Sequence, residues 1–288
     1  MTQNLAHADR TGQRVLVRDR LRHPLVFRRL TVLRRTGLGG NLLRLTVGGA
    51  DLAGFVATGP GDHVKLFVPD PATGELHVPT VGPDGGIQRP AVPATVRDYT
   101  PRAVRPGELD IDVVLHEHAG PVSAWAAAAR PGDPLAIGGP RGSQLVPTDA
   151  DHFLLGGDET ALPALARWLE LVPAGVPVDV LVEASHPSAG EYLAEVARPE
   201  HHVQVLDRAG ADPGSTTVLA DAARSAAVRP GTGFAWFAGE AGSLVPLRRW
   251  LRNDSAFDRR NTKVDGYWKR GIVALDHHAP IDPDDPED

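Results

Sequence analysis

The fold of this chain follows from one stretch, Leu154-Leu155-Gly156-Gly157-Asp158-Glu159-Thr160-Ala161-Leu162-Pro163-Ala164. An apolar strand runs into a tight glycine turn, and a helix follows with Thr160 as a candidate N-cap and Pro163 in its first turn. The stretch is neither a Gly-x-Gly-x-x-Gly fingerprint nor a P-loop. Ligands of α/β domains bind at the carboxyl ends of strands. Because Asp158 and Glu159 would repel a bare phosphate, we expect them to face ribose, nicotinamide or a neighbouring domain, or else only to cap the helix.

The same rhythm continues toward the C-terminus. After Pro147-Thr148-Asp149, apolar strands alternate with helical segments, which indicates a parallel sheet with crossover helices. The strands are expected at 152–156, 178–183, 202–206 and 234–239, and the helices at 162–171, 191–198, 218–228 and 244–252.

The first half of the chain has a different pattern. Short, partly alternating runs are bounded by Gly/Pro clusters, a spacing typical of a small antiparallel barrel. These runs are 29–34, 42–47, 63–68 and 109–116. The predicted fold class is therefore a two-domain β + α/β protein, with an N-terminal arm at 1–24, an antiparallel β-barrel at 25–148, a parallel-sheet α/β domain at 149–271 and an acidic tail at 272–288.

Composition excludes several classes of chemistry. The 288 residues include no cysteine, which rules out disulfides, thiolate zinc sites, cysteine nucleophiles and cysteine-ligated iron–sulfur clusters. The net charge of −6 lies in residues 276–288, which hold six acids and no Lys or Arg, so the body is neutral. A Pro/Asp run of this kind cannot bury apolar surface, and we expect a solvated, disordered tail. The charge balance also argues against nucleic-acid binding.

The sequence gives no sign of a membrane segment. No apolar run approaches the about 18 residues that a membrane helix needs. The arginine-rich N-terminus is not followed by an apolar segment, so it is not expected to be a secretory signal. We expect a cytoplasmic protein without membrane insertion. The sequence is compatible with a monomer but does not determine the oligomeric state.

Two motifs of the barrel half have the chemistry of a phosphate and ring site. In Arg97-Asp98-Tyr99-Thr100-Pro101-Arg102, the Arg97 guanidinium can clamp a pyrophosphate, and Tyr99 points to the same face of a strand and can lie along a flat ring. Thr100 offers a hydroxyl and an N–H. In the second motif, a strand ends at Leu115-His116, and a short helix opens with Ser123 near its N-terminus, where free N–H groups suit an anion.

That second motif also contains His116-Glu117-His118, a spacing found in some metal sites. No third ligand is evident, so we expect no metal, and His116 is better interpreted as a packing or hydrogen-bonding residue. In the α/β half, Gly239-Glu240 and Gly242 allow another close backbone approach after a strand. Tyr267-Trp268-Lys269-Arg270 is either a docking terminus or a lid with two aromatic rings for a cofactor and two cations for an anion.

Together these segments resemble the siderophore-interacting protein family, which comprises FAD-dependent ferric-siderophore reductases of the ferredoxin-reductase-like superfamily. The matching motifs occur in the family's order between about residues 25 and 271. They are His63-Val64-Lys65-Leu66-Phe67, Arg97-x-Tyr99-Thr100-x-Arg102, Val113-Val114-Leu115-His116, Gly120-Pro121-x-Ser123-x-Trp125, Gly156 to Ala164, Ala238-Gly239-Glu240 and Gly266-Tyr267-Trp268-Lys269-Arg270-Gly271.

The resemblance implies a role for each matching residue. The barrel would bind FAD, and the α/β domain would be NAD(P)H-binding-like. The implied cofactor-binding residues are Arg97, Tyr99, Thr100, Val114, Leu115, His116, Ser123, Trp125, Asp158, Glu159, Thr160, Gly239, Glu240, Tyr267 and Trp268. The implied substrate-binding cations are Lys65, Arg141, Lys269 and Arg270.

The implied activity is ferric-siderophore reduction, in which NADH or NADPH reduces FAD and FAD reduces Fe(III) in an anionic siderophore complex. Ferrous iron binds the hard oxygens of such a chelator far less well, so reduction releases it. The cofactor carries this chemistry, and no catalytic side chain is expected. Two alternatives remain open: a general NAD(P)H:flavin oxidoreductase with another acceptor, and a cytosolic siderophore-binding protein without turnover. The sequence does not distinguish NADH, NADPH and reduced ferredoxin as donors, although the lack of an arginine cluster for a 2′-phosphate favours NADH.

Overall fold

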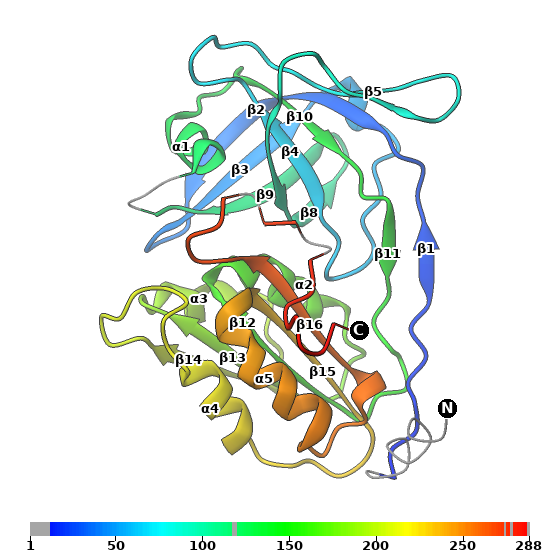
Figure 1. The fold of residues 1–288 in the computed structure, drawn as a ribbon, viewed down its shortest axis with the longest axis vertical. Helices are drawn as coiled ribbons and strands as arrows, with labels where there is room; N and C mark the ends of the chain where they lie inside the picture. Colours follow the sequence, from blue (N-terminus) through cyan, green and yellow to red (C-terminus); the bar gives the residue numbers. More distant parts are fainter. Residues whose placement is uncertain (1–11, 117–119, 274, 277–278, 287–288) are drawn as a thin grey trace. The chain divides into compact units, whose positions relative to one another are not determined.

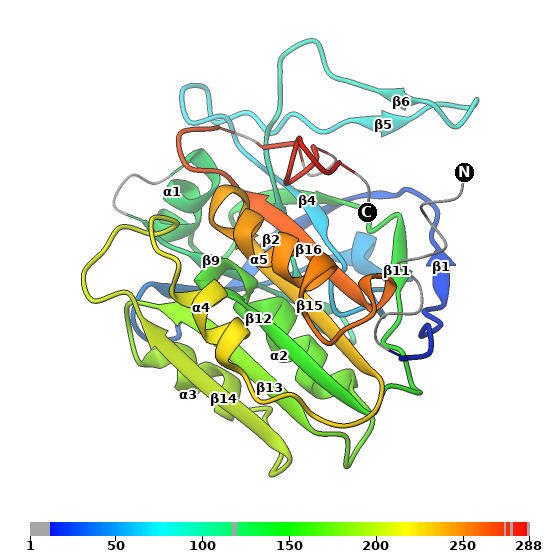
Figure 2. The ribbon, with the colours of Figure 1, turned by 60° about the horizontal axis from the view of Figure 1, so that its bottom comes forward.

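The computed structural model describes residues 12–116, 120–273, 275–276 and 279–286. Two compact units divide the chain. One is Asp19–Leu145, and the other joins the N-terminal segment up to Arg18 with the chain from Val146 onward. Each unit is described by itself (Figures 1 and 2).

The first unit is an antiparallel barrel. Its main sheet has seven strands in the order β7-β4-β10-β2-β3-β9-β8. The four predicted runs lie in β2, β3, β4 and β9. The elements are β1 (Arg20–Arg22), β2 (Phe27–Gly37), β3 (Leu42–Gly48), β4 (Val64–Val68), β5 (Thr80–Val81), β6 (Ile87–Gln88), β7 (Thr95–Tyr99), β8 (Pro101–Arg105), β9 (Glu108–Val114), α1 (Pro121–Ala128), β10 (Pro134–Gly138) and β11 (Gly142–Gln144).

Alternation of apolar residues builds the barrel core. Leu109, Ile111 and Val113 of β9 are completely buried, and they pack with Leu45 of β3 and Leu66 of β4. Residues two apart on a strand share a face, so a single register sends all of these side chains inward. The sequence did not reveal the central strand β10, because its five residues begin inside a Pro/Gly cluster that we interpreted as a boundary.

The second unit is a five-stranded parallel sheet in the order β14-β13-β12-β15-β16. Helices α2 and α3 pack on one face, and α4 and α5 pack on the other. The elements are β12 (His152–Asp158), α2 (Leu162–Leu171), β13 (Val178–Ala184), α3 (Ser188–Ala194), β14 (His201–Asp207), α4 (Val218–Ser225), β15 (Gly233–Glu240), α5 (Ala241–Asn253) and β16 (Thr262–Trp268). The prediction of a parallel sheet with crossover helices is confirmed.

Aromatic side chains fill the face under α2. Trp168 of α2 lies against Phe234 and Trp236 of β15, with ring centroids 5.5 and 5.9 Å away. The guanidinium of Arg18 lies 4.7 Å from the centre of the Phe234 ring. The N-terminal segment therefore docks on this unit, and buried Asn261 fastens it by accepting from the Leu16 N–H and donating to the Arg14 carbonyl oxygen.

The described part of the acidic tail contradicts the prediction of a disordered segment. Asp282 is 1 % exposed and forms a bidentate ion pair with Arg249 of α5, at 2.5 and 2.8 Å. Asp285 pairs with Arg248 on the same helix, and Ile281 packs against the core beneath it. The arginines of α5 neutralise acids that the sequence alone leaves unpaired, so this stretch packs although it is rich in Pro and Asp.

Candidate functional site

Glycines let β12 and β15 approach closely at their carboxyl ends. A Cβ on Gly157 would lie 2.2 Å from the carbonyl oxygen of Ala238, a distance that no side chain tolerates. Gly239 has a φ of +151°, which favours glycine, and it lies against the Asp158 carboxylate. The strand order reverses between β12 and β15. In open α/β sheets this switch point is where ligands bind.

Asp158 joins three strands at this edge. Its carboxylate accepts hydrogen bonds from the Thr160 N–H at 2.9 Å, the Glu240 N–H at 3.0 Å and the Trp268 indole at 2.8 Å. Burial raises the pKa of Asp158, and these bonds only partly oppose that effect. The N-cap of the turn is therefore Asp158, whereas we expected Thr160. The buried Asp158 carboxylate therefore holds the carboxyl ends of β12, β15 and β16 together.

Glu159 is held by an arginine that the sequence analysis missed. Arg208, which follows β14, donates two bonds of 2.7 Å to the Glu159 carboxylate, and both residues are buried. Burial alone would raise the pKa of Glu159, but the bonds and charge of Arg208, with the Ser185 N–H, outweigh it and lower that pKa. The only sign of this pair in the sequence was the position of Arg208 just after the predicted strand at 202–206.

A second acid at this edge was also missed. Glu183 of β13 is 3 % exposed, and burial raises its pKa. Among the described residues, its Oε1 and the Nε of Arg208 are buried without a hydrogen-bond partner. Unpaired buried polar atoms next to a glycine cradle fit a site that a polar ligand completes.

Glu240 and the terminal cations lie at the end of β15 and just beyond β16. The buried Glu240 carboxylate accepts from the Ser243 N–H at 2.5 Å, which caps α5, and from the Arg270 N–H at 3.0 Å. The Arg270 guanidinium forms a largely exposed ion pair with Asp212 at 3.3 Å. Lys269 is exposed.

Tyr267 and Trp268 belong to the sheet. Their backbone forms β16, which pairs in parallel with β15. The ring of Tyr267 lies edge-on to Trp236, with centroids 6.4 Å apart, whereas Trp268 bonds to Asp158. Neighbouring residues of a strand point to opposite faces, so only Trp268 reaches the Asp158 carboxylate.

In the barrel unit, β7 holds two of the proposed flavin-binding residues, Arg97 and Tyr99. Tyr99 packs against the barrel core, and burial raises its pKa to about 12. The partly buried Arg97 donates to the Val96 carbonyl oxygen at 2.7 Å, and no carboxylate pairs with it among the described residues. Thr100 is buried. A guanidinium that no described carboxylate neutralises, near a partly buried phenol ring, fits the pyrophosphate and ring of FAD.

Helix α1 lies against β4 and β7. Gly120 is its N-cap, and the Ser123 hydroxyl donates to the Gly120 carbonyl oxygen at 3.0 Å. Trp125 and Leu115 pack on the barrel core, Val114 is buried and His116 is exposed. His118 lies outside the described residues. Within the described chain, no three His, Asp or Glu side chains are grouped to hold a metal ion.

The side chain of Lys65, in β4, points to the outer face of the barrel. It alternates with the buried residues Val64 and Leu66, and its ammonium group lies 3.0 Å from the Asp98 carboxylate. Arg141 is exposed and follows β10, whose last residue, Gly138, pairs with Lys65. The two predicted substrate-binding cations of this unit are therefore near one edge of the sheet. Lys269 and Arg270 belong to the other unit.

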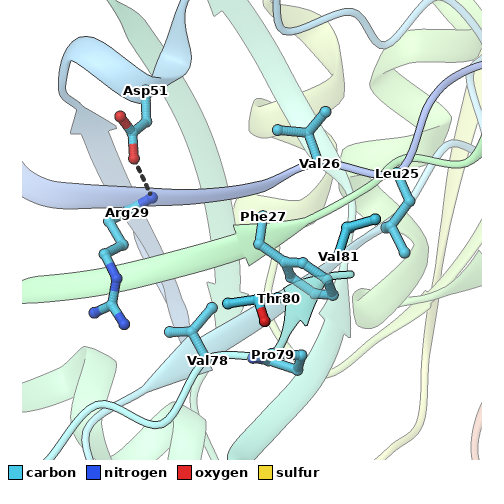
Figure 3. Close-up of a pocket in the computed structure, with 9 residues that line it drawn as sticks. All are labelled: Leu25, Val26, Phe27, Arg29, Asp51, Val78, Pro79, Thr80 and Val81. Carbon is cyan, nitrogen blue, oxygen red and sulfur yellow. Dashed lines mark hydrogen bonds between the residues drawn. The ribbon is translucent and has the colours of Figure 1, made fainter. Parts of the chain in front are cut away.

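The same unit contains a cavity of about 350 Å³ that the sequence did not suggest (Figure 3). The start of β2 and the segment around β5 line it. Its apolar lining consists of Leu25, Val26, Phe27, Val78, Pro79 and Val81.

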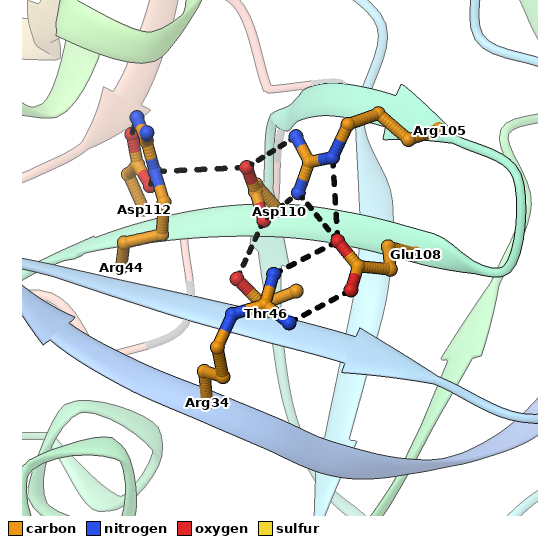
Figure 4. Close-up of polar contacts among 7 residues, drawn as sticks. All are labelled: Arg34, Arg44, Thr46, Arg105, Glu108, Asp110 and Asp112. Carbon is orange, nitrogen blue, oxygen red and sulfur yellow. Dashed lines mark hydrogen bonds and ion pairs between the residues drawn. The ribbon is translucent and has the colours of Figure 1, made fainter.

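Paired acids of β9 do not form an active site. Asp110 accepts two bonds from Arg105, and Asp112 accepts two from Arg44, all at 2.7–2.8 Å (Figure 4). Arg105 also pairs with Glu108. Each carboxylate is neutralised by an arginine of a neighbouring strand or turn, so this network stabilises the sheet face opposite the core.

Comparison with known proteins gives two family matches. Residues 31–144 match the siderophore-interacting FAD-binding domain, and residues 150–271 match the siderophore-interacting protein domain. Every helix in the described part of the chain is too short or too polar to cross a bilayer.

Individual relatives are consistent with these family matches. Ferric vibriobactin reductase of Vibrio cholerae is 35 % identical over 253 residues, 85 % of this chain and 90 % of its own. An NADPH-dependent ferric-chelate reductase of Escherichia coli is 41 % identical over 185 residues, 62 % of this chain and 71 % of its own. The crystal structure of a siderophore utilization protein from T. fusca superposes with a TM-score of 0.85 at 39 % identity, covering 91 % of this chain and 100 % of that one.

Proposed function

Because the chain belongs to the siderophore-interacting protein family, we propose that it is a ferric-siderophore reductase that passes electrons from NADH or NADPH through FAD to Fe(III) in an anionic siderophore complex. The relatives named for ferric-chelate and ferric-vibriobactin reduction support this activity. The single observation that carries it is the pair on β7: an arginine without a carboxylate partner among the described residues, next to a partly buried tyrosine that packs on the barrel core.

In this proposal, the side chains of the protein bind and orient FAD and the dinucleotide donor. Arg97 neutralises the pyrophosphate of FAD, Tyr99 supports a flat ring, and the N-terminus of α1 at Ser123 provides N–H groups for a phosphate. The glycine cradle at Gly157 admits the dinucleotide donor to the carboxyl edge of β12. Bound FAD supplies the conversion of a two-electron donor into single-electron reduction of iron.

Substrate attraction is electrostatic. Lys65 and Arg141 attract an anionic chelate to an exposed edge of the barrel sheet, and an exposed pair such as Lys65–Asp98 costs little to exchange. Once iron is ferrous, the hard oxygen donors of the chelator hold it weakly and it leaves. We further propose that the protein is a cytoplasmic monomer, which cell fractionation and light scattering would test.

The direct test is anaerobic. Protein loaded with FAD should bleach at 450 nm with NADH or NADPH, regain its absorbance when a ferric siderophore is added, and release Fe(II) to a ferrous indicator. Arg97→Ala should weaken FAD binding by about tenfold or more, as expected for a lost charge-assisted contact, whereas Arg34→Ala on the exposed face should not. Protein that gains no FAD on titration would refute the proposal. Bleaching without reoxidation by any ferric chelate would indicate another acceptor, and chelate binding without bleaching would indicate a carrier.

A further inference from the structure

The cavity in the barrel unit has the chemistry of a binding site. Phe27 and Pro79 line it together with Val26 and Val81, which are 37 % and 43 % exposed (Figure 3). Sites for small molecules are concave and mostly apolar, with a few polar groups that fix orientation. A cavity of this size, about 350 Å³, holds a ring or a short acyl chain.

Phe27, which lines the cavity, is connected through the sheet to the cation proposed to attract the chelate. Phe27 of β2 pairs with Gly138 of β10, and Gly138 pairs with Lys65 of β4. Directly opposed residues of an antiparallel sheet point to the same face. The ring of Phe27 lies over Gly138, where a Cβ would be 2.8 Å from the ring edge. Phe27 and Lys65 therefore share one face of the sheet, with Gly138 between them in the register and the ring of Phe67 beside that glycine.

A free positive charge lies at the rim. Arg29, two residues beyond Phe27 on the same face, lines the cavity and is exposed, and its guanidinium pairs with no carboxylate among the described residues. Asp51 is engaged instead by the backbone N–H of Arg29, at 3.1 Å. An apolar lining beside an unpaired guanidinium is complementary to an amphipathic anion, in which a ring or chain carries an oxygen anion.

We propose that this cavity binds the apolar arm, aryl or acyl, of an anionic ferric chelate, with Arg29 pairing with an oxygen anion on that arm while Lys65 faces the iron-binding oxygens. The inference rests on the proposed function, since it names the part of the substrate that this surface recognises. The cavity then discriminates among ferric chelates by the size and polarity of the arm that lies outside the iron-binding oxygens.

Redox-inert gallium(III) complexes test this by calorimetry on the FAD-loaded protein. Tris(benzohydroxamate) and tris(acetohydroxamate) complexes share donor atoms and charge and differ only in the apolar arm. The benzohydroxamate complex should bind at least about tenfold more tightly, or about 1.4 kcal/mol. Val81→Asp should abolish that difference. Val104→Asp is the matched control, because Val104 is 39 % exposed and lies on β8, at the other edge of the sheet.

A third probe, the tris(4-carboxybenzohydroxamate) complex, tests the rim. Arg29→Ala should weaken this complex about tenfold and leave the uncharged benzohydroxamate complex unchanged. Equal affinity of the first two complexes for the unaltered protein, absence of binding of the anionic carboxy complex, or equal losses in the two valine variants would overturn the site. Gallium is not reduced, so the expected binding pattern with no reduction of the iron complexes would refute only the proposed function.

Discussion

Replacing Arg208 with methionine should leave the buried carboxylate of Glu159 without its charged partner. The pair with Glu159 is among the most buried in the α/β unit, with side chains 3 % and 8 % exposed and two bonds of 2.7 Å. In Arg208→Met the Ser185 backbone N–H, at 3.1 Å, remains as a donor to Glu159. Breaking a buried pair from one side costs about 3–5 kcal/mol, because the remaining charge cannot recover its hydration. We expect the free energy of unfolding to fall by that amount.

The chain offers a matched control. Arg229 and Asp179 form an ion pair of similar geometry in the same unit, at 2.6 and 2.8 Å, but their side chains are 29 % and 24 % exposed. Water can rehydrate Asp179, so Arg229→Met should cost about 1 kcal/mol or less. The double variant Glu159→Met/Arg208→Met should recover most of the loss, since apolar replacement of both partners of a buried pair is often neutral.

The pH dependence has a definite sign. In the unaltered protein the folded pKa of Glu159 is lowered, so its contribution to stability is present above the ordinary glutamate pKa and is lost as pH falls through the folded value. In Arg208→Met, burial acts without the arginine and raises the folded pKa. The deficit of the variant should therefore shrink as pH falls from 7 toward 5.

Urea unfolding followed by tryptophan fluorescence measures these changes, because Trp168 and Trp236 lie in the core of the same unit. Equal losses in Arg208→Met and Arg229→Met would refute the argument that burial sets the cost. A deficit in Arg208→Met that does not change between pH 7 and pH 5 would refute the assignment of that cost to a charged Glu159.

Three further perturbations test other parts of the structure. Lys65→Ala should raise the KM for anionic ferric chelates about tenfold and leave the FAD affinity unchanged, as steady-state kinetics and flavin titration would show. Gly157→Ala should lower the free energy of unfolding by about 1–3 kcal/mol or more, because its Cβ would meet the Ala238 carbonyl oxygen at 2.2 Å; urea denaturation measures it. Asp282→Asn should weaken the pair with Arg249 and accelerate limited proteolysis between residues 272 and 281.

Each of these variants has a counterpart in the chain. Lys263 forms an ion pair with Asp265 at 3.2 Å with similar exposure, and Lys263→Ala should change neither KM nor FAD affinity. A Cβ on Gly37 would meet nothing within 4 Å, so Gly37→Ala should be close to neutral. Asp284 also bonds to Arg249, but its side chain is 86 % exposed, and Asp284→Asn should leave proteolysis unchanged. A control that behaves like its partner variant would contradict the corresponding argument.

The sequence predicted much of the fold, because local patterns repeat where a face is buried. Strand–helix alternation after Asp149 identified the parallel sheet, and the predicted helix at 162–171 coincides with α2. It missed β10 and β16. A Pro/Gly cluster opens the first, and the two aromatics beside two cations at the end of the second were compatible with a docking terminus or a lid and did not indicate a strand. Both are strands because neighbouring strands supply the backbone partners.

The candidate site divides in the same way. The glycine turn, Asp158 and the Arg97–Tyr99 motif are local, so the sequence by itself identified them and, with them, the family. Only the tertiary structure decided that Arg208 neutralises Glu159, that Arg249 pairs with Asp282, and that a cavity forms between the start of β2 and the segment around β5. A sequence motif shows which turn, cap or strand a short stretch of backbone can form. Ion pairs and cavities join residues far apart in the chain, and their burial, which sets both their pKa and their cost, exists only after the chain has folded.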